Sequence, residues 1–283
     1  MNKISRNEQS FLRCCHAGSE RLTQYLSSLP PESWQIPSAC EGWEVRDVVG
    51  HLAWGAKLYL SAISRGVKGD TSPPEGYPPE GEIDRKTFPV WAAQQAITYR
   101  ERQGEQLLDA LTARNAQLHD LMAGLRSQDW EKPCYHPLGL REVKVLVVFR
   151  AIELSLHTWD IQSVLELSTS LLPESLPILM ERIPAMLSGT FQPDTRLRSP
   201  IRYRFLVKGA VPGELDLVIE RDRLQVEPIG TAEAQVTCRS DTETFALLMF
   251  HRLSPQTAIA RGRLTVEGER GLMLTFGKWF KFV

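Results

Sequence analysis

Apolar residues recur at steps of three and four over the first part of the chain, which is the spacing of helices that bury one face. Three such segments cover residues 7–29, 45–65 and 90–125. We expect the third to break near residues 112–115. A fourth segment, residues 141–167, is apolar on nearly every side. Four long helices are what a helical bundle requires, so the pattern predicts one.

The period changes to two after residue 200. Tyr203, Phe205 and Val207 alternate with polar residues, as in a half-buried strand. Further strands are expected at residues 213–220, 223–227, 234–238 and 264–266. Helices are expected at residues 242–250, capped by Asp241, and at 272–280. This order predicts an α+β chain: a four-helix bundle over residues 1–171, a helical linker over 172–198, and an α/β domain over 199–283 whose mixed sheet carries helices on one face.

One line of polar residues crosses the apolar segment 141–167. Arg150, Glu153, His157 and Asp160 are spaced by three and four, so they share one face of the helix. A helix that is apolar almost all round is buried. Burying even a neutral polar group without a partner costs on the order of 2–7 kcal/mol, so these side chains need partners. Glu153 and His157, four residues apart, are well placed to bind a metal from one side.

His51 is a candidate third ligand. It lies at the edge of the packing face of the helix predicted over residues 45–65. Two imidazoles and one carboxylate leave a fourth position open, which is typical of a catalytic zinc site. The alternative is a buried hydrogen-bond network without metal. Arg150 and Asp160 either hold the ligands through hydrogen bonds or form an ordinary charge pair on the helix surface.

Two motifs carry a resemblance to a known family. The chain reads Gly42-Trp43-x-Val45-Arg46-Asp47-x-x-x-His51-Leu52 and, far downstream, Glu153-x-x-x-His157-x-Trp159-Asp160. This pattern resembles the mycothiol-dependent maleylpyruvate isomerase family, within the DinB/YfiT-like superfamily of metal-binding four-helix bundles. One departure is Glu44, which stands where the family often has a better helix cap, Thr or Ser.

The resemblance covers nearly the whole chain and implies both a site and a reaction. It implies that His51, Glu153 and His157 bind a divalent metal, most simply zinc, and that the C-terminal part is similar to sterol carrier proteins. The expected cofactor is a low-molecular-weight thiol, mycothiol or an analogue. The expected function is that of a metal-dependent, thiol-using isomerase or S-transferase acting on a small electrophile. A metal-dependent hydrolase and a non-catalytic metal- or ligand-binding protein are the alternatives.

Composition narrows the classes of partner. The 33 Lys and Arg residues nearly balance the 34 Asp and Glu residues, so no net field attracts nucleic acid. No apolar run approaches the ~20 residues that span a membrane. The N-terminus lacks the apolar core of a signal peptide, and five cysteines without framework spacing fit a reducing compartment. The sequence therefore predicts a cytoplasmic protein with a small-molecule substrate, and it does not indicate the oligomeric state.

The chain contains no sequence motif of a nucleotide-binding site or of a serine hydrolase. It contains no Gly-x-Gly-x-x-Gly, Walker-type or Gly-x-Ser-x-Gly sequence. The Gly- and Pro-rich stretch 66–89 is long for a connection between helices, and it is either a solvated linker or a lid.

Overall fold

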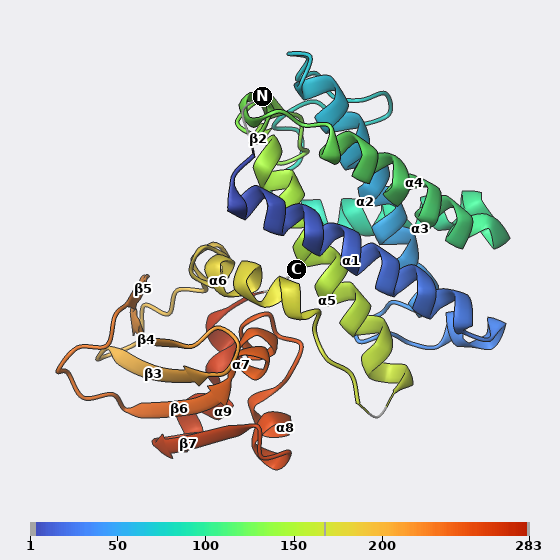
Figure 1. The fold of residues 1–283 in the computed structure, drawn as a ribbon. Coiled ribbons are helices and arrows are strands. Elements are labelled where there is room, and N and C mark those ends of the chain that lie inside the picture. The colour runs from blue at the N-terminus through green and yellow to red at the C-terminus, as the bar shows by residue number, and fades with distance from the viewer. Residues whose placement is uncertain (1–3, 167, 282–283) are drawn as a thin grey trace. The chain divides into compact units, whose positions relative to one another are not determined.

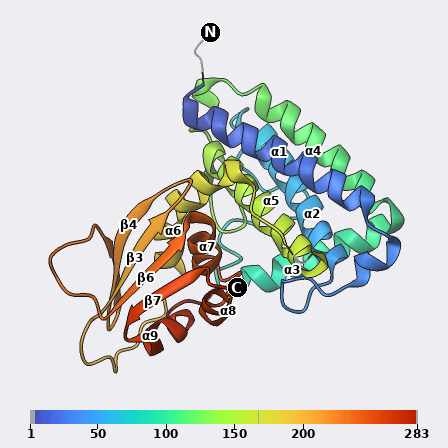
Figure 2. The same cartoon turned by 60° about the horizontal axis from the view of Figure 1, so that its bottom comes forward.

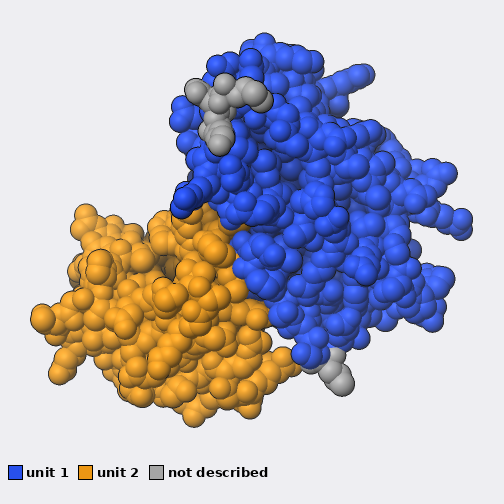
Figure 3. All heavy atoms as spheres, in the orientation of Figure 1, with its two compact units in different colours: residues 1–175 blue, residues 176–283 orange. Residues whose placement is uncertain are grey.

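The computed structural model describes residues 4–166 and 168–281 of the chain. Contacts along the backbone divide it into two compact units, residues 1–175 and 176–283 (Figures 1 and 3). The first unit is helical and the second is α/β, so the predicted α+β class is confirmed. Leu167, where the predicted site helix ends, lies outside the described residues.

The first unit is the predicted bundle. Its helices are α1 (Arg6–Ser28), α2 (Val45–Gly66), α3 (Phe88–Gln103), α4 (Leu107–Ala123) and α5 (Val143–Leu165). Helix α2 packs against α3, α4 and α5, and α1 packs against α4 and α5 (Figure 1). Helices α3 and α4 follow one another along the chain, and each of them packs against α2. The core of the unit therefore surrounds α2 and α5, the two helices that carry the predicted ligands.

The break in the third helix lies earlier than the sequence pattern suggests. The expectation of a break at residues 112–115 is wrong, because α4 is continuous from Leu107 to Ala123. The chain turns instead at Gly104, whose φ of 55° is a left-handed conformation that glycine adopts readily. Thr112 stays helical with its hydroxyl donating to the Leu108 carbonyl at 2.9 Å.

Helix α2 begins at Val45 despite the poor cap residue before it. Asp47, in the first turn, accepts a hydrogen bond from the Glu44 backbone N–H at 2.9 Å. The Asp47 carboxylate is in turn held by Arg100 of α3 at 2.5 Å. A carboxylate in the first turn also matches the positive end of the helix dipole. The start of the helix is therefore fixed by the side chain three residues in.

The Gly- and Pro-rich stretch between α2 and α3 is attached to the bundle. The Tyr77 ring stacks on Trp54 of α2, with centroids 6.4 Å apart, and Tyr135 donates its hydroxyl to the Pro78 carbonyl at 2.6 Å. Tyr135 lies in the loop of a short hairpin, β1 (Pro133–Cys134) with β2 (Arg141–Glu142), which the sequence pattern did not indicate. These contacts indicate that the stretch is held against the bundle and is not a free, solvated linker.

The second unit is a five-stranded mixed sheet with helices. Its strands are β3 (Ile201–Lys208), β4 (Gly213–Glu220), β5 (Arg223–Glu227), β6 (Val236–Asp241) and β7 (Leu264–Gly268), and its helices are α6 (Leu176–Thr190), α7 (Thr242–Met249), α8 (Pro255–Ala260) and α9 (Arg270–Leu274). The strand order is β5-β4-β3-β6-β7, in which β3 and β6 run parallel and the other neighbours antiparallel (Figure 2). Helix α6 lies within the stretch predicted as a linker.

Alternation along β3 gives the sheet one apolar and one charged face. Phe205 packs against Phe245 of α7 at a centroid distance of 5.3 Å. On the opposite face, Arg204 donates to the buried carboxylate of Asp216 at 2.9 Å. Asp241 caps α7 as predicted, because its carboxylate accepts from the Thr244 backbone N–H at 2.6 Å.

The last predicted helix is shorter than expected. Residues 272–280 do not form one helix, since α9 ends at Leu274 and a 3-10 turn, Phe276–Trp279, follows. Side chains three apart lie directly above one another in a 3-10 helix. Phe276 and Trp279 therefore face the same way, and both contact Tyr203. Burying these two large aromatic side chains on one side stabilises the chain more than a continuation of the α-helix would.

No helix among the described residues combines the length and the apolar character that crossing a membrane demands.

Candidate metal centre

Two histidines from separate helices lie side by side. Helices α2 and α5 pack together, and the rings of His51 and His157 meet edge-on with centroids 4.9 Å apart. Trp43, just before α2, and Trp54, one turn after His51, flank the His51 ring at 5.5 and 6.1 Å. Residues more than a hundred positions apart in the sequence thus form one imidazole pair with aromatic walls.

Glu153 lies one turn before His157 on α5, and its two oxygens differ. Oε1 accepts a hydrogen bond from the Tyr59 hydroxyl at 2.7 Å. Oε2 is buried, lies 3.7 Å from Arg150 Nη1, and has no hydrogen-bond partner among the described residues. A methyl group added at Gly55 would lie 3.5 Å from Oε2, so this glycine leaves room beside it. One oxygen is therefore oriented while the other remains able to take a further partner.

The His157 ring is held from its other edge by Asp160. Nδ1 of His157 and Oδ2 of Asp160 are 2.9 Å apart, and Asp160 is fully buried. The same Oδ2 accepts from the Cys40 thiol at 3.2 Å, and the Ala39 backbone N–H donates to the Asp160 carbonyl at 3.0 Å. With Nδ1 engaged, Nε2 is the nitrogen left to bind a metal. In metal-binding histidines, the N–H of the second ring nitrogen commonly donates a hydrogen bond to a carboxylate in this way.

Arg150 supports the opposite side of the site. Its guanidinium is 1% exposed and donates to the Leu52 carbonyl at 3.0 Å and to Asn115 Oδ1 at 2.6 Å. Burial lowers the pKa of Arg150, and the Glu153 carboxylate opposes that shift. Interpreting Arg150 and Asp160 as a surface charge pair is wrong, because both are buried and each contacts a different predicted ligand.

The donor atoms of His51, Glu153 and His157 are of types that bind metals, although they do not all lie close to one common point. Imidazole and carboxylate are zinc ligands. Glu153 Oε2, beside the space at Gly55, has no hydrogen-bond partner among the described residues and is an oxygen that an ion would satisfy. Among the described residues, the set of three donors that all lie within 4.8 Å of one another is a different one, Cys40, His157 and Asp160. The ligand set His51, Glu153 and His157 therefore remains a prediction.

Sequence reasoning did not place Cys40 in the site. Cys40 is partly exposed and contacts both His157 and Asp160. Its position two residues before the Gly-Trp corner was the available signal, because a corner that leads into the ligand helix must pass close to the ligands.

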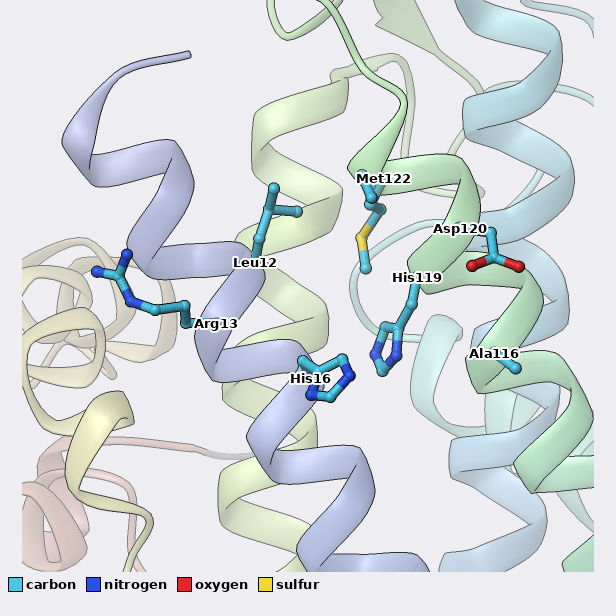
Figure 4. A pocket seen from close by; sticks show the side chains of 8 residues that line it. Leu12, Arg13, His16, Ala116, His119, Asp120 and Met122 are labelled. Atoms are coloured by element: carbon cyan, nitrogen blue, oxygen red, sulfur yellow. The ribbon is translucent and has the colours of Figure 1, made fainter. Parts of the chain in front are cut away.

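A separate hollow lies between α1 and α4 (Figure 4), with a volume of about 470 Å³. His16 and His119 face one another across it, with ring centroids 5.2 Å apart. His119 Nε2 lies 3.3 Å from the Ser19 hydroxyl, and His16 Nδ1 lies 3.0 Å from Glu20. None of the predicted site residues lines this hollow, and its histidines already have partners.

Comparison with known proteins supports the resemblance and the fold. Residues 15–162 match the family model of the mycothiol maleylpyruvate isomerase N-terminal domain, and residues 201–281 match that of the SCP-2 sterol transfer family. No match was found among curated protein sequences.

Two solved structures share the fold over nearly the full length. One is the crystal structure of the mycothiol-dependent maleylpyruvate isomerase, with 13% identity, a TM-score of 0.60, and coverage of 88% of this chain and 90% of that one. The other is a histidine-to-alanine mutant of the mycothiol-dependent maleylpyruvate isomerase, with 12% identity, a TM-score of 0.62 and coverage of 92% of each chain. Because the first family model spans more than half of the chain, this protein belongs to the mycothiol maleylpyruvate isomerase N-terminal domain family, and its later residues 201–281 are similar to the SCP-2 sterol transfer family.

Proposed function

We propose that this protein is a metal-dependent enzyme that uses a low-molecular-weight thiol to isomerise a small electrophile or to transfer sulfur to it. The observation that carries the proposal is the pair of His51 and His157, whose ring centroids are 4.9 Å apart. The His157 ring is held at Nδ1 by buried Asp160. The family, and two solved structures with the same fold, are named for a mycothiol-dependent maleylpyruvate isomerase. An unsaturated keto acid of that kind is the substrate class we assign.

His51, Glu153 and His157 would hold the metal, and zinc suits two imidazoles and one carboxylate. When bound there, a divalent metal supplies a Lewis acid that keeps a thiol in its nucleophilic thiolate form at neutral pH.

The surrounding residues orient these donors. Asp160 accepts a hydrogen bond from Nδ1 of His157 and so leaves the Nε2 lone pair available for a metal. Tyr59 fixes one oxygen of Glu153, and Arg150 places a positive charge 3.7 Å from the other. This charge offsets the cost of a largely buried carboxylate before any ion is bound. The Trp43 and Trp54 rings limit the access of water beside His51.

The reaction needs no oxidant, reductant or other co-reactant besides the thiol and the substrate. In a substrate whose double bond is conjugated to a carbonyl group, a thiolate adds to the carbon of that double bond farther from the carbonyl. The π electrons then shift along the conjugated system onto the carbonyl oxygen. The former double bond is now single and rotates. Expulsion of the thiolate then restores the double bond in the other geometry, so the thiol is regenerated. If a proton quenches the adduct instead, the product is a stable thioether and the enzyme acts as an S-transferase.

Purified protein with its native metal tests the proposal against a panel of thiols, including mycothiol and glutathione, with maleylpyruvate and simpler unsaturated keto acids as substrates. We expect turnover that needs both thiol and metal and that is lost after chelation and restored by added zinc. Turnover of ester or amide substrates without thiol would establish a hydrolase instead. Bound metal with no turnover of any substrate would indicate a binding protein.

A further inference from the structure

Cys40 differs from the other cysteines of the chain in its surroundings. Cys14, Cys134 and Cys238 are at most 1% exposed, and burial raises the pKa of each to about 12. Cys15 is also fully buried, with its pKa raised further. Cys40 is partly exposed, in the loop before α2. Of the five cysteines, Cys40 is thus the one that a thiol-seeking ion in solution reaches without unfolding the protein.

Cys40 Sγ stands in a triangle of donor atoms. It lies 3.2 Å from Asp160 Oδ2 and 3.8 Å from His157 Nδ1, and the last two atoms are 2.9 Å apart. A tetrahedral zinc ion with one sulfur, one nitrogen and one oxygen ligand at ~2.0–2.3 Å separates its ligand atoms by roughly 3.3–3.6 Å. The observed separations lie on either side of that range. Shifts of roughly half an ångström would close the triangle around an ion.

We propose that Cys40 Sγ, His157 Nδ1 and Asp160 Oδ2 form a second metal position, which takes a soft divalent ion such as Cd²⁺ or excess Zn²⁺. It is distinct from the set His51, Glu153 and His157, because it uses the other nitrogen of His157. A thiolate, an imidazole nitrogen and a carboxylate favour zinc-like ions over Mg²⁺ and Ca²⁺, which prefer oxygen ligands.

Binding at this position balances in protons and charge. The ion displaces the Cys40 thiol proton to solvent, and the sulfur–metal bond replaces the hydrogen bond to Asp160. His157 frees its Nδ1 by moving that proton to Nε2 when Nε2 is unoccupied. When Nε2 already holds a metal, the Nδ1 proton leaves to solvent instead. With Nε2 unoccupied, one thiolate and one carboxylate neutralise the ion. With a metal at Nε2, the imidazolate shares its negative charge between the two ions, so no unpaired charge stays buried in either case.

The two positions share His157, and this links the inference to the proposed function. An ion at the second position removes the carboxylate that orients His157, so we expect it to weaken metal binding at the first position. The existence of the second position does not rest on the proposed function, because it needs neither His51 nor Glu153. The two can therefore be tested apart.

Cadmium titration of the purified full-length protein provides the test, because a sulfur–cadmium bond gives an ultraviolet charge-transfer band that imidazole and carboxylate ligands do not. We expect the band to saturate at one added equivalent in the wild type and to be absent from Cys40→Ser. Cys238→Ala, a matched loss of a buried thiol, should retain it. Excess Mg²⁺ should leave it unchanged.

His51→Ala separates this inference from the proposed function. It removes a donor of the first position and none of the second, so the cadmium band should persist even if the native metal is lost. Cadmium-113 NMR of the wild type gives a reading that depends on no variant, since a sulfur-ligated ion resonates apart from one bound by nitrogen and oxygen. A wild type without the band, or a band of equal size in Cys40→Ser, overturns the second position, whatever the first one does.

Discussion

Replacing Tyr59 by phenylalanine removes one oxygen atom from the interior of the bundle and tests how Glu153 is held. The hydroxyl donates to Glu153 Oε1 at 2.7 Å, and Tyr59 is 4% exposed. Burial and the neighbouring carboxylate raise the pKa of Tyr59 well above its ordinary range, so the phenol is protonated and acts as the donor. In the variant, Oε1 loses this partner while the ring that packs against α5 remains.

The size of the effect follows from the bond that is lost. A hydrogen bond to a charged group contributes about 1.5–3 kcal/mol. Without it, the carboxylate is able to rotate toward Arg150, which now lies 3.7 Å from Oε2, and that oxygen then accepts a direct hydrogen bond from the guanidinium in place of the metal. Loss of a residue that orients a metal ligand typically weakens metal binding by about 10- to 100-fold. That range corresponds to about 1.4–2.7 kcal/mol, which agrees with the hydrogen-bond figure.

Competition of the protein with a chromogenic chelator measures the metal dissociation constant of wild type and Tyr59→Phe. We expect this constant to rise about 10- to 100-fold in the variant. Tyr135→Phe is the matched control, because its hydroxyl also makes one short hydrogen bond, to the Pro78 carbonyl at 2.6 Å, away from the predicted ligands. An unchanged or lower dissociation constant in Tyr59→Phe would refute the role given to this hydroxyl.

Three further predictions concern stability and domain organisation. Burial lowers the pKa of His136 to about 4. As the pH falls, the imidazole is therefore protonated in the unfolded state before it is protonated in the folded state. The free energy of unfolding should be highest above pH 6.5 and fall by up to about 3 kcal/mol toward pH 4. His136→Asn should flatten that part of the pH profile in urea unfolding, and an equally steep profile would contradict this. A methyl group at Gly66 would lie 2.5 Å from Cys134 Cβ, so Gly66→Ala should lower the melting temperature, whereas Gly124→Ala, with its nearest neighbour at 3.5 Å, should not. Limited proteolysis should first cut the chain between the two domains, near residues 191–200, leaving a bundle fragment, and early cuts within α5 would contradict the proposed division.

Much of the fold was predictable because periodicity reports burial. The segment containing Arg150 to Asp160 is apolar on nearly every side, and most residues of α5 from Val143 to Gln162 are buried. Alternation at Tyr203, Phe205 and Val207 likewise predicted β3. The break at Gly104 was missed because a left-handed glycine can end a helix without any change in the apolar period.

The site was predictable only along one helix at a time. The spacing of Glu153 and His157 follows from helix geometry, whereas the approach of Cys40 to Asp160 joins residues 120 positions apart and depends on how α2 and α5 pack. The charge-pair interpretation of Arg150 failed for the same reason, since its partners Asn115 and Leu52 lie on other helices. Tertiary contacts of this kind do not appear in the apolar period of a single helix.

Metal analysis of the wild type and of His51→Ala tests the central claim most directly, because His51 belongs to the proposed catalytic centre and not to the second position. His16→Ala is the control, since its imidazole pairs with Glu20 at the surface, 3.0 Å away. We predict about one divalent ion per chain in the wild type and in the control, as a catalytic zinc site holds. His51→Ala, folded by circular dichroism, should carry almost none. Full metal content in folded His51→Ala would contradict the account.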